Sequence, residues 1–192
     1  MIPVGTPGFR ANCVSCVCGA AAVLLFYLFC QRWYSWRGLR HSSALALVPA
    51  GLMAFAPLFW QYHTQAEVFS LNNLLIAAQL LLLQRLAAAL YAREGAAADA
   101  DDARLAGIAR PALAGAFAVG LGFANQHTIV FQSLPIVAFA LGAPAMHGRG
   151  PPLHRPETLA RLAAAGLAGL SPYLYFMSPP PPRARAPRAP RA

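Results

Sequence analysis

Long apolar stretches alternate with short polar or basic stretches along this chain. One helix needs about 20 apolar residues to cross the core of a bilayer. Several of the stretches are shorter, so they are expected to cross with little tilt or to enter the membrane as broken helices. The pattern predicts an all-α fold: a polytopic membrane helical bundle with about six short transmembrane or re-entrant helices. The six segments are residues 12–30, 44–60, 68–90, 111–124, 128–146 and 159–177.

Prolines and glycines refine the expected ends of these helices. Residues 1–10 contain two prolines and two glycines, which is the composition of a loop. Pro111 is expected at the first position of a helix, where the missing amide hydrogen costs nothing. Pro135 and Pro144 are expected to interrupt the segment that contains them.

The composition supports a membrane protein and argues against a protein that binds nucleic acid. Apolar residues make up 58% of the chain and charged residues only 11%. The charged fraction is less than half of what a soluble domain of this kind usually carries. The net charge of +9 comes from fifteen arginines without any lysine. These arginines lie next to apolar segments, so membrane topology explains them better than nucleic acid does.

The arginines also predict the orientation of the chain. Three loops are basic, and two turns between them contain no arginine. Because basic loops stay on the cytoplasmic side of a membrane, the two turns are expected on the luminal side. The basic loops are residues 31–43, 85–110 and 147–161, and the polar turns are residues 61–66 and 125–127.

Two regions of the chain are expected to differ in order. Residues 1–178 are interpreted as a membrane-embedded core. Residues 179–192 consist largely of proline and arginine, and such low-complexity sequence is expected to form a disordered tail.

The four cysteines are interpreted as small hydrophobic residues of a helix. A metal site would need a further pair of cysteines or histidines at a suitable spacing. The sequence contains no such pair, so no metal is expected, and the residues indicate no cofactor. The cysteines are Cys13, Cys16, Cys18 and Cys30.

Glu67 is the one acidic residue outside the predicted cytoplasmic loops. A carboxylate at the luminal membrane level is costly unless it is paired or near water, so Glu67 is a candidate for substrate binding. Alternatively, Thr64 caps the following helix and Glu67 completes a capping box. Asn72 and Asn73 lie deeper, and they are expected to hydrogen-bond a neighbouring helix rather than a substrate.

The second polar turn contains a run from Asn125 to Thr128. His127 could exchange protons near neutral pH, or the run could simply cap the next helix through Asn125 or Thr128. Arg10 could pair with a lipid phosphate or act as an anchor at the interface. Since both turns are expected on one membrane face, we hypothesise that their polar residues form one luminal site. Its candidate residues are His63, Glu67, Asn125, Gln126 and His127.

These residues belong to motifs that resemble the transmembrane protein 260 family. The resemblance covers about residues 5–178. Its most distinctive run is WQYxxQAEVFSLNN at residues 60–73, and a second is GLGxANQHT at residues 120–128. Two further runs are FRANxxSxxxGA at residues 9–20 and PYLY at residues 172–175.

The resemblance implies an enzyme. The family is similar to multi-spanning glycosyltransferases of the C type, which transfer mannose from dolichyl-phosphate mannose to Ser or Thr of luminal proteins. The implied partners are therefore the lipid bilayer, a lipid-linked sugar and a luminal acceptor protein, and the implied location is the endoplasmic reticulum membrane. In such enzymes an acidic residue of the first luminal loop activates the acceptor hydroxyl as general base.

The acidic residue implied by the resemblance is not found at the matching place. No acidic residue precedes Glu67, so the catalytic base is expected upstream of residue 1. The chain is accordingly expected to be truncated at both ends and inactive by itself. Two alternative interpretations are a non-catalytic membrane scaffold and a transporter-like segment, since interrupted helices with polar residues are also typical of transporters.

Overall fold

The computed structural model describes residues 5–65, 67–91, 101–146 and 153–177, and the regular elements of this part are helices. The expected all-α fold is therefore confirmed. The expected tail at 179–192 lies outside the described residues. The elements are α1 (Pro7–Trp36), α2 (Ser42–Phe55), α3 (Pro57–His63), α4 (Val68–Tyr91), α5 (Asp101–Asn125), the 3-10 helix η2 (His127–Ile129), α6 (Val130–Met146), α7 (Pro156–Gly169) and α8 (Ser171–Met177).

Three of the described helices are long and apolar enough to cross a membrane. They are α1, α4 and the Gly107–Asn125 part of α5. The pair α2 and α3 passes the same test as a unit, but the two helices are bent by 64° at their junction. The described residues thus hold three candidate spans, or four if the bent pair is one broken span. The predicted membrane helical bundle is confirmed.

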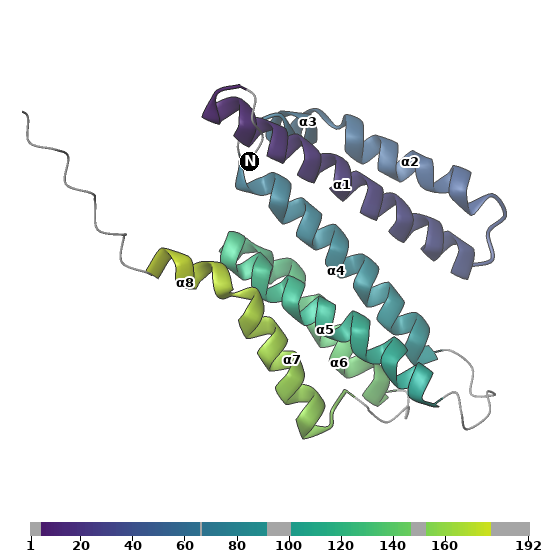
Figure 1. The fold of residues 1–192 in the computed structure, drawn as a ribbon. Helices are drawn as coiled ribbons and strands as arrows, with labels where there is room; N and C mark the ends of the chain where they lie inside the picture. Colours follow the sequence, from purple (N-terminus) through teal and green to yellow (C-terminus); the bar gives the residue numbers. More distant parts are fainter. Residues whose placement is uncertain (1–4, 66, 92–100, 147–152, 178–192) are drawn as a thin grey trace, which may run out of the picture.

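Helix α4 lies in the middle of the bundle (Figure 1). It packs against α1 on one side and α5 on the other, while α2 packs on α1 and α7 packs on α5. Helices α1 and α4 run in the same direction, and α2 and α5 run in the opposite direction. Consequently the start of α4, the end of α5 and α8 gather at one end of the bundle.

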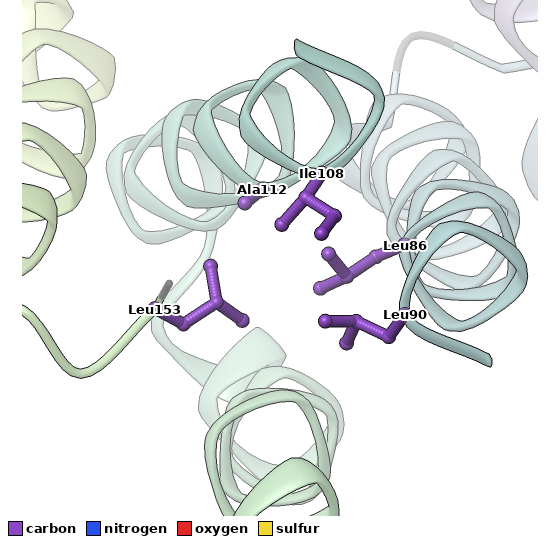
Figure 2. Packing of buried hydrophobic residues seen from close by; sticks show 5 residues of the cluster. All are labelled: Leu86, Leu90, Ile108, Ala112 and Leu153. Atoms are coloured by element: carbon purple, nitrogen blue, oxygen red, sulfur yellow. The ribbon is translucent and has the colours of Figure 1, made fainter. Parts of the chain in front are cut away.

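A hydrophobic cluster joins the helices at the other end. Leu86 and Leu90 of α4 face Ile108 and Ala112 of α5, and Leu153 enters from the segment before α7 (Figure 2). Leu153 is 2% exposed, and burial of a leucine side chain is worth about 1.5–3 kcal/mol. The cluster fixes this end by apolar packing.

Glycines allow α5 and α7 to approach each other closely. A side chain added to Gly120 would overlap the carbonyl oxygen of Gly166, and one added to Gly169 would overlap that of Phe117. Small residues at the crossings of membrane helices bring the two backbones into contact. Gly120 belongs to the GLGxANQHT run, so this part of the motif has a packing role.

Buried glutamines connect α4 to its neighbours within the apolar part of the bundle. Gln79 Nε2 donates to the carbonyl oxygen of Ala118 in α5 (3.4 Å), and Gln79 Oε1 accepts from the Ser133 hydroxyl of α6 (2.9 Å). Gln84 Nε2 donates to the carbonyl oxygen of Phe29 in α1 (3.1 Å). Hydrogen bonds of this kind between membrane helices contribute about 0.6–2 kcal/mol each.

Two helix starts differ from the expectation. Helix α1 already begins at Pro7, because the Thr6 hydroxyl oxygen accepts a hydrogen bond from the Phe9 amide and caps the helix. The prediction of a loop over residues 1–10 is therefore wrong from Pro7 onward, and Arg10 lies within α1. Pro111 lies inside α5 and not at its first position, since membrane helices tolerate an internal proline whose freed carbonyl finds another partner.

The expected interruptions also lie at different places. Segment 44–60 divides at Ala56, which has an extended backbone between α2 and α3, because the following Pro57 disfavours helical backbone at the residue before it. Segment 159–177 divides between α7 and α8. Helix α6, in contrast, runs through both of its prolines without a break. The interruption expected at Pro135 and Pro144 is therefore wrong.

Candidate functional site

The two polar turns meet at one end of the bundle. One turn connects α3 to α4, and the other connects α5 to α6 through η2. Asn125 Nδ2, at the end of α5, donates a hydrogen bond of 3.1 Å to the carbonyl oxygen of Val68, at the start of α4. This bond ties the turns together because Val68 directly follows Glu67. The antiparallel course of α4 and α5 makes the contact possible (Figure 1).

His63, the last residue of α3, is buried at 6% exposure. Its ring stacks on Phe59 with 3.6 Å between the ring centres. His63 Nδ1 lies 2.6 Å from the carbonyl oxygen of Phe59, and Nε2 lies 3.5 Å from Asn73 Nδ2. A neutral ring protonated at Nδ1 satisfies both contacts, because Nδ1 donates to the carbonyl and Nε2 accepts from the amide. Both ring nitrogens are thus occupied within the protein.

Gly19 of α1 provides the space for this ring. A side chain added to Gly19 would overlap the Cβ, Cγ and Cδ2 atoms of His63. Because Asn73 belongs to α4, the ring of His63 connects α1, α3 and α4 at one point. This geometry gives His63 a packing role between three helices.

The capping box expected from Thr64 and Glu67 does not form. Thr64 is the C-cap of α3, and its hydroxyl donates toward the carbonyl oxygens of Trp60 and Gln61, at 3.1 and 3.2 Å. It therefore completes the end of α3, where carbonyl groups lack helical partners, and does not start α4. Glu67 is exposed, and its carboxylate has no hydrogen-bond or ionic partner among the described residues.

The structure also reveals contacts of the α3–α4 turn that sequence reasoning missed. The Ser70 hydroxyl donates to the carbonyl oxygen of Tyr62 (3.1 Å), and the rings of Tyr62 and Phe69 lie 4.7 Å apart. These contacts fold α3 back against α4 and so set the position of Glu67 between them. Tyr62, Phe69 and Ser70 all belong to the WQYxxQAEVFSLNN run, and this is the sequence feature that could have indicated the contacts.

The two asparagines near the start of α4 differ in their contacts. Asn73 contacts His63 of the neighbouring α3, as the sequence suggested. Asn72 is buried at 8% exposure, and its Oδ1 has no partner among the described residues. A buried oxygen without a partner costs about 1–3 kcal/mol, so a further donor at this place would stabilise the protein.

His127 in the second turn is exposed. Its Nε2 lies 3.2 Å from the Tyr173 hydroxyl of α8, and that hydroxyl donates to the carbonyl oxygen of Phe123 (3.1 Å). Since the hydroxyl has one hydrogen to donate, it accepts from a protonated Nε2. In the neutral ring Nδ1 then keeps its lone pair. An exposed histidine in this state can accept a hydrogen bond from a ligand.

The capping role considered for Asn125 and Thr128 is not observed. Gln126 is the N-cap of η2, and no side-chain hydrogen bond caps this short helix. Asn125 instead extends across to α4 and bonds Val68. Gln126 Oε1 is buried without a partner in the described part of the chain, so it adds an unsatisfied acceptor beside His127.

Arg10 lies near the start of α1, at the same end as the two turns (Figure 1). Its side chain is half-buried, and its Nε is buried with no partner among the residues that the structure describes. A guanidinium group binds phosphate strongly through paired N–H groups. Arg10 is therefore the cationic candidate at this end.

The chemistry of this end suits hydroxyl groups and an anion. It offers the exposed carboxylate of Glu67, the exposed imidazole of His127 and the half-buried side chain of Arg10. Within the described ranges no three His, Cys, Asp or Glu residues are grouped in a way that could hold a metal ion. Hydrogen-bonding groups of these types are the ones that bind sugars and phosphates.

Comparison with known proteins identifies the family of this chain. Residues 1–144 match the family described as "Protein O-mannosyl-transferase TMEM260 N-terminal domain". The chain belongs to the TMEM260 family. The resemblance noted in the sequence is thereby confirmed, and with it the membership in a family of membrane glycosyltransferases.

Two curated relatives carry the name protein O-mannosyl-transferase TMEM260. The Mus musculus protein is 35% identical over 177 residues, which cover 92% of this chain and 22% of the relative. The Dictyostelium discoideum protein is 30% identical over 177 residues, which cover 90% of this chain and 19% of the relative. This chain therefore spans about a fifth of the length of these relatives. No solved structure matches it.

The structure brings together the TMEM260 motifs. Asn125 of the second run bonds Val68 of the first, and His127 contacts Tyr173 of the PYLY run. Gly19 of the N-terminal run packs against His63 at the end of α3. Motifs that lie far apart in the sequence thus form one polar end of the membrane bundle.

Proposed function

We propose that this chain forms a substrate-binding part of the membrane core of a protein O-mannosyltransferase. Mannose would pass from dolichyl-phosphate mannose to a Ser or Thr hydroxyl of a luminal protein. The polar end of the bundle would face the lumen of the endoplasmic reticulum, and the arginine-rich loops would face the cytoplasm.

The observation that carries this proposal is the hydrogen bond between Asn125 and Val68. It holds the turn with Glu67 beside the turn with His127, so that an exposed carboxylate and an exposed imidazole belong to one end of the bundle. A glycosyl acceptor and a sugar phosphate need such groups near each other, at the membrane surface where a lipid-linked sugar presents its head.

The transfer step assigns roles to these residues. The acceptor oxygen attacks the anomeric carbon, the bond from that carbon to the phosphate oxygen breaks, and the acceptor proton passes to a general base. We assign Glu67 to hydrogen bonds with sugar or acceptor hydroxyls, and His127 to a hydrogen bond with the donor. Arg10 is assigned to the phosphate, whose negative charge grows as it leaves.

The general base is proposed to lie outside these 192 residues. Glu67 lies in the turn after α3, and we assign it to substrate binding and not to the role of general base. The chain by itself is therefore expected to give no mannose transfer from dolichyl-phosphate mannose to a Ser/Thr peptide. Clear turnover by the purified chain would contradict this part of the proposal.

A chimera with the mouse relative tests the proposed function. The aligned part of this chain would replace the corresponding part of that protein, and transfer of labelled mannose would be measured. Glu67→Gln is expected to lower transfer about tenfold or more, since a charge-assisted hydrogen bond worth about 1.5–3 kcal/mol is lost. Glu157→Gln is the matched control, because Glu157 is exposed in the first turn of α7 at the other end.

Two results would contradict the proposal. One is a folded chimera that transfers no mannose. The other is a Glu67→Gln variant that transfers as fast as Glu157→Gln at equal thermal stability.

A further inference from the structure

A groove of about 420 Å³ lies between α1 and the bent pair of α2 and α3. Small residues of α1, among them Gly19 and Ala20, form one wall, and Ala54 and Phe55 at the end of α2 belong to the other. The 64° bend between α2 and α3 shapes this second wall, because the two helices meet there at an angle. The lining is almost entirely apolar.

The groove opens to the outside of the bundle. Phe55 and Trp60 line it and are 80% and 61% exposed, and α1 and α2 form the outer edge of the bundle (Figure 1). Both α1 and the α2–α3 pair are candidate membrane spans. The medium around the groove is therefore hydrocarbon, and a polar occupant without partners would be unfavourable there.

The polar groups at the end of the groove are already satisfied. Both ring nitrogens of His63 are occupied, and the Thr64 hydroxyl donates to carbonyl oxygens of α3. No lysine or arginine belongs to the lining. The groove thus offers nothing that would select a charged headgroup, and it suits a hydrocarbon chain.

The groove is short along α1. The α1 residues that line it run from Cys16 to Val23, which is roughly 10 Å of helix at 1.5 Å per residue. A single hydrocarbon chain is thin enough to fit.

We propose that this groove binds one acyl chain of a bilayer phospholipid. The chain lies along α1 and fills the space left by the break between α2 and α3. The proposal does not depend on mannose transfer. An isoprenoid chain and another segment of protein are the competing occupants, and the experiment below distinguishes them.

Photo-crosslinking tests this site in the 192-residue chain. The protein is placed in bilayers of phosphatidylcholine that contain a photoreactive acyl chain, and the labelled residues are found by mass spectrometry. Labels are expected on groove residues such as Cys16 and Phe55 at severalfold higher yield than on Val17, which is 68% exposed on α1 but does not line the groove. Equal labelling of both sets would overturn the proposal, because it would indicate ordinary contact with bulk lipid.

Substitutions that fill the groove provide the second arm. Ala20→Trp and Ala54→Phe fill it from opposite walls and are expected to reduce groove labelling at least fivefold, whereas Val17→Trp is expected to leave it unchanged. Unchanged labelling in both folded groove variants would overturn the proposal. Loss of labelling on addition of a few equivalents of polyprenyl phosphate would overturn it in favour of an isoprenoid site. Absence of any groove label in the wild-type chain would overturn it in favour of a covering protein segment.

Discussion

The two polar turns of the bundle lie at the same end, but they hold their histidines in opposite ways. His63 in the α3–α4 turn is buried, stacked on Phe59 and bonded through both nitrogens. His127 in the α5–α6 turn is exposed and contacts the Tyr173 hydroxyl through Nε2. Residue type and predicted location are the same for both, so the difference comes from the surroundings.

The two histidines therefore have different roles in the proposed site. A histidine whose nitrogens are occupied stabilises the fold and offers nothing to a ligand, whereas one with a free nitrogen is available for a hydrogen bond with a ligand. The α3–α4 turn thus provides the fixed side of the proposed site, and Glu67 is its exposed group. The α5–α6 turn provides the accessible side.

Filling the space that Gly19 leaves for the buried histidine is expected to have the largest effect on stability. Gly19→Leu is expected to destabilise the protein by about 3 kcal/mol or more, the upper range for overpacking, because the new side chain would overlap His63. Gly8→Leu is the matched control, since nothing lies within 4 Å of a side chain added at Gly8. Thermal unfolding in detergent measures both. Equal melting temperatures would show that the ring is not held against α1.

Replacing each histidine by alanine is expected to have the next largest effect on stability. His63→Ala is expected to destabilise by about 1–3 kcal/mol, because it leaves a cavity and unpaired groups on Phe59 and Asn73. His127→Ala is expected to stay within about 0.5 kcal/mol of the wild type, as is usual for an exposed side chain. A larger loss for His127→Ala than for His63→Ala would reverse the comparison.

The smallest expected change concerns the bond that joins the turns. Asn125→Ala is expected to cost about 0.5–1.5 kcal/mol, since one hydrogen bond to the Val68 carbonyl is lost. Thr128→Ala, an exposed position in the same turn, serves as the control and is expected to change little. Hydrogen exchange at the start of α4 measures the local effect. Equal exchange rates in both variants would indicate that the turns are not coupled through Asn125.

Much of the fold could be predicted because it depends on local pattern. The segment 68–90 corresponds closely to α4 (Val68–Tyr91), since its apolar run is long and uninterrupted. Helix ends were less predictable, as the early start of α1 at Pro7 illustrates. The Thr6 hydroxyl sets this boundary because it caps the helix. A pattern of hydrophobic residues does not reveal such a single hydrogen bond.

The site was predictable only in part because its contacts join distant parts of the chain. Topology placed the turns with Glu67 and His127 at one end, and the structure brings these turns together. The short capping motif at Thr64 was misleading, since the same residue types fit the end of one helix as well as the start of the next. The roles of Gly19 and Tyr173 depend on partners more than forty residues away, and no local pattern identifies such pairs.

We propose that both polar turns face one side of the membrane, opposite the basic loop after α1. In a background with the four native cysteines changed to alanine, Glu67→Cys, Thr128→Cys and Leu39→Cys would each be treated with a membrane-impermeant thiol reagent in sealed microsomes. Leu39→Cys, in the exposed α1–α2 loop, is expected to react at once, and the other two only after the membrane is permeabilised. Reaction of Glu67→Cys and Thr128→Cys from different sides would contradict a single site.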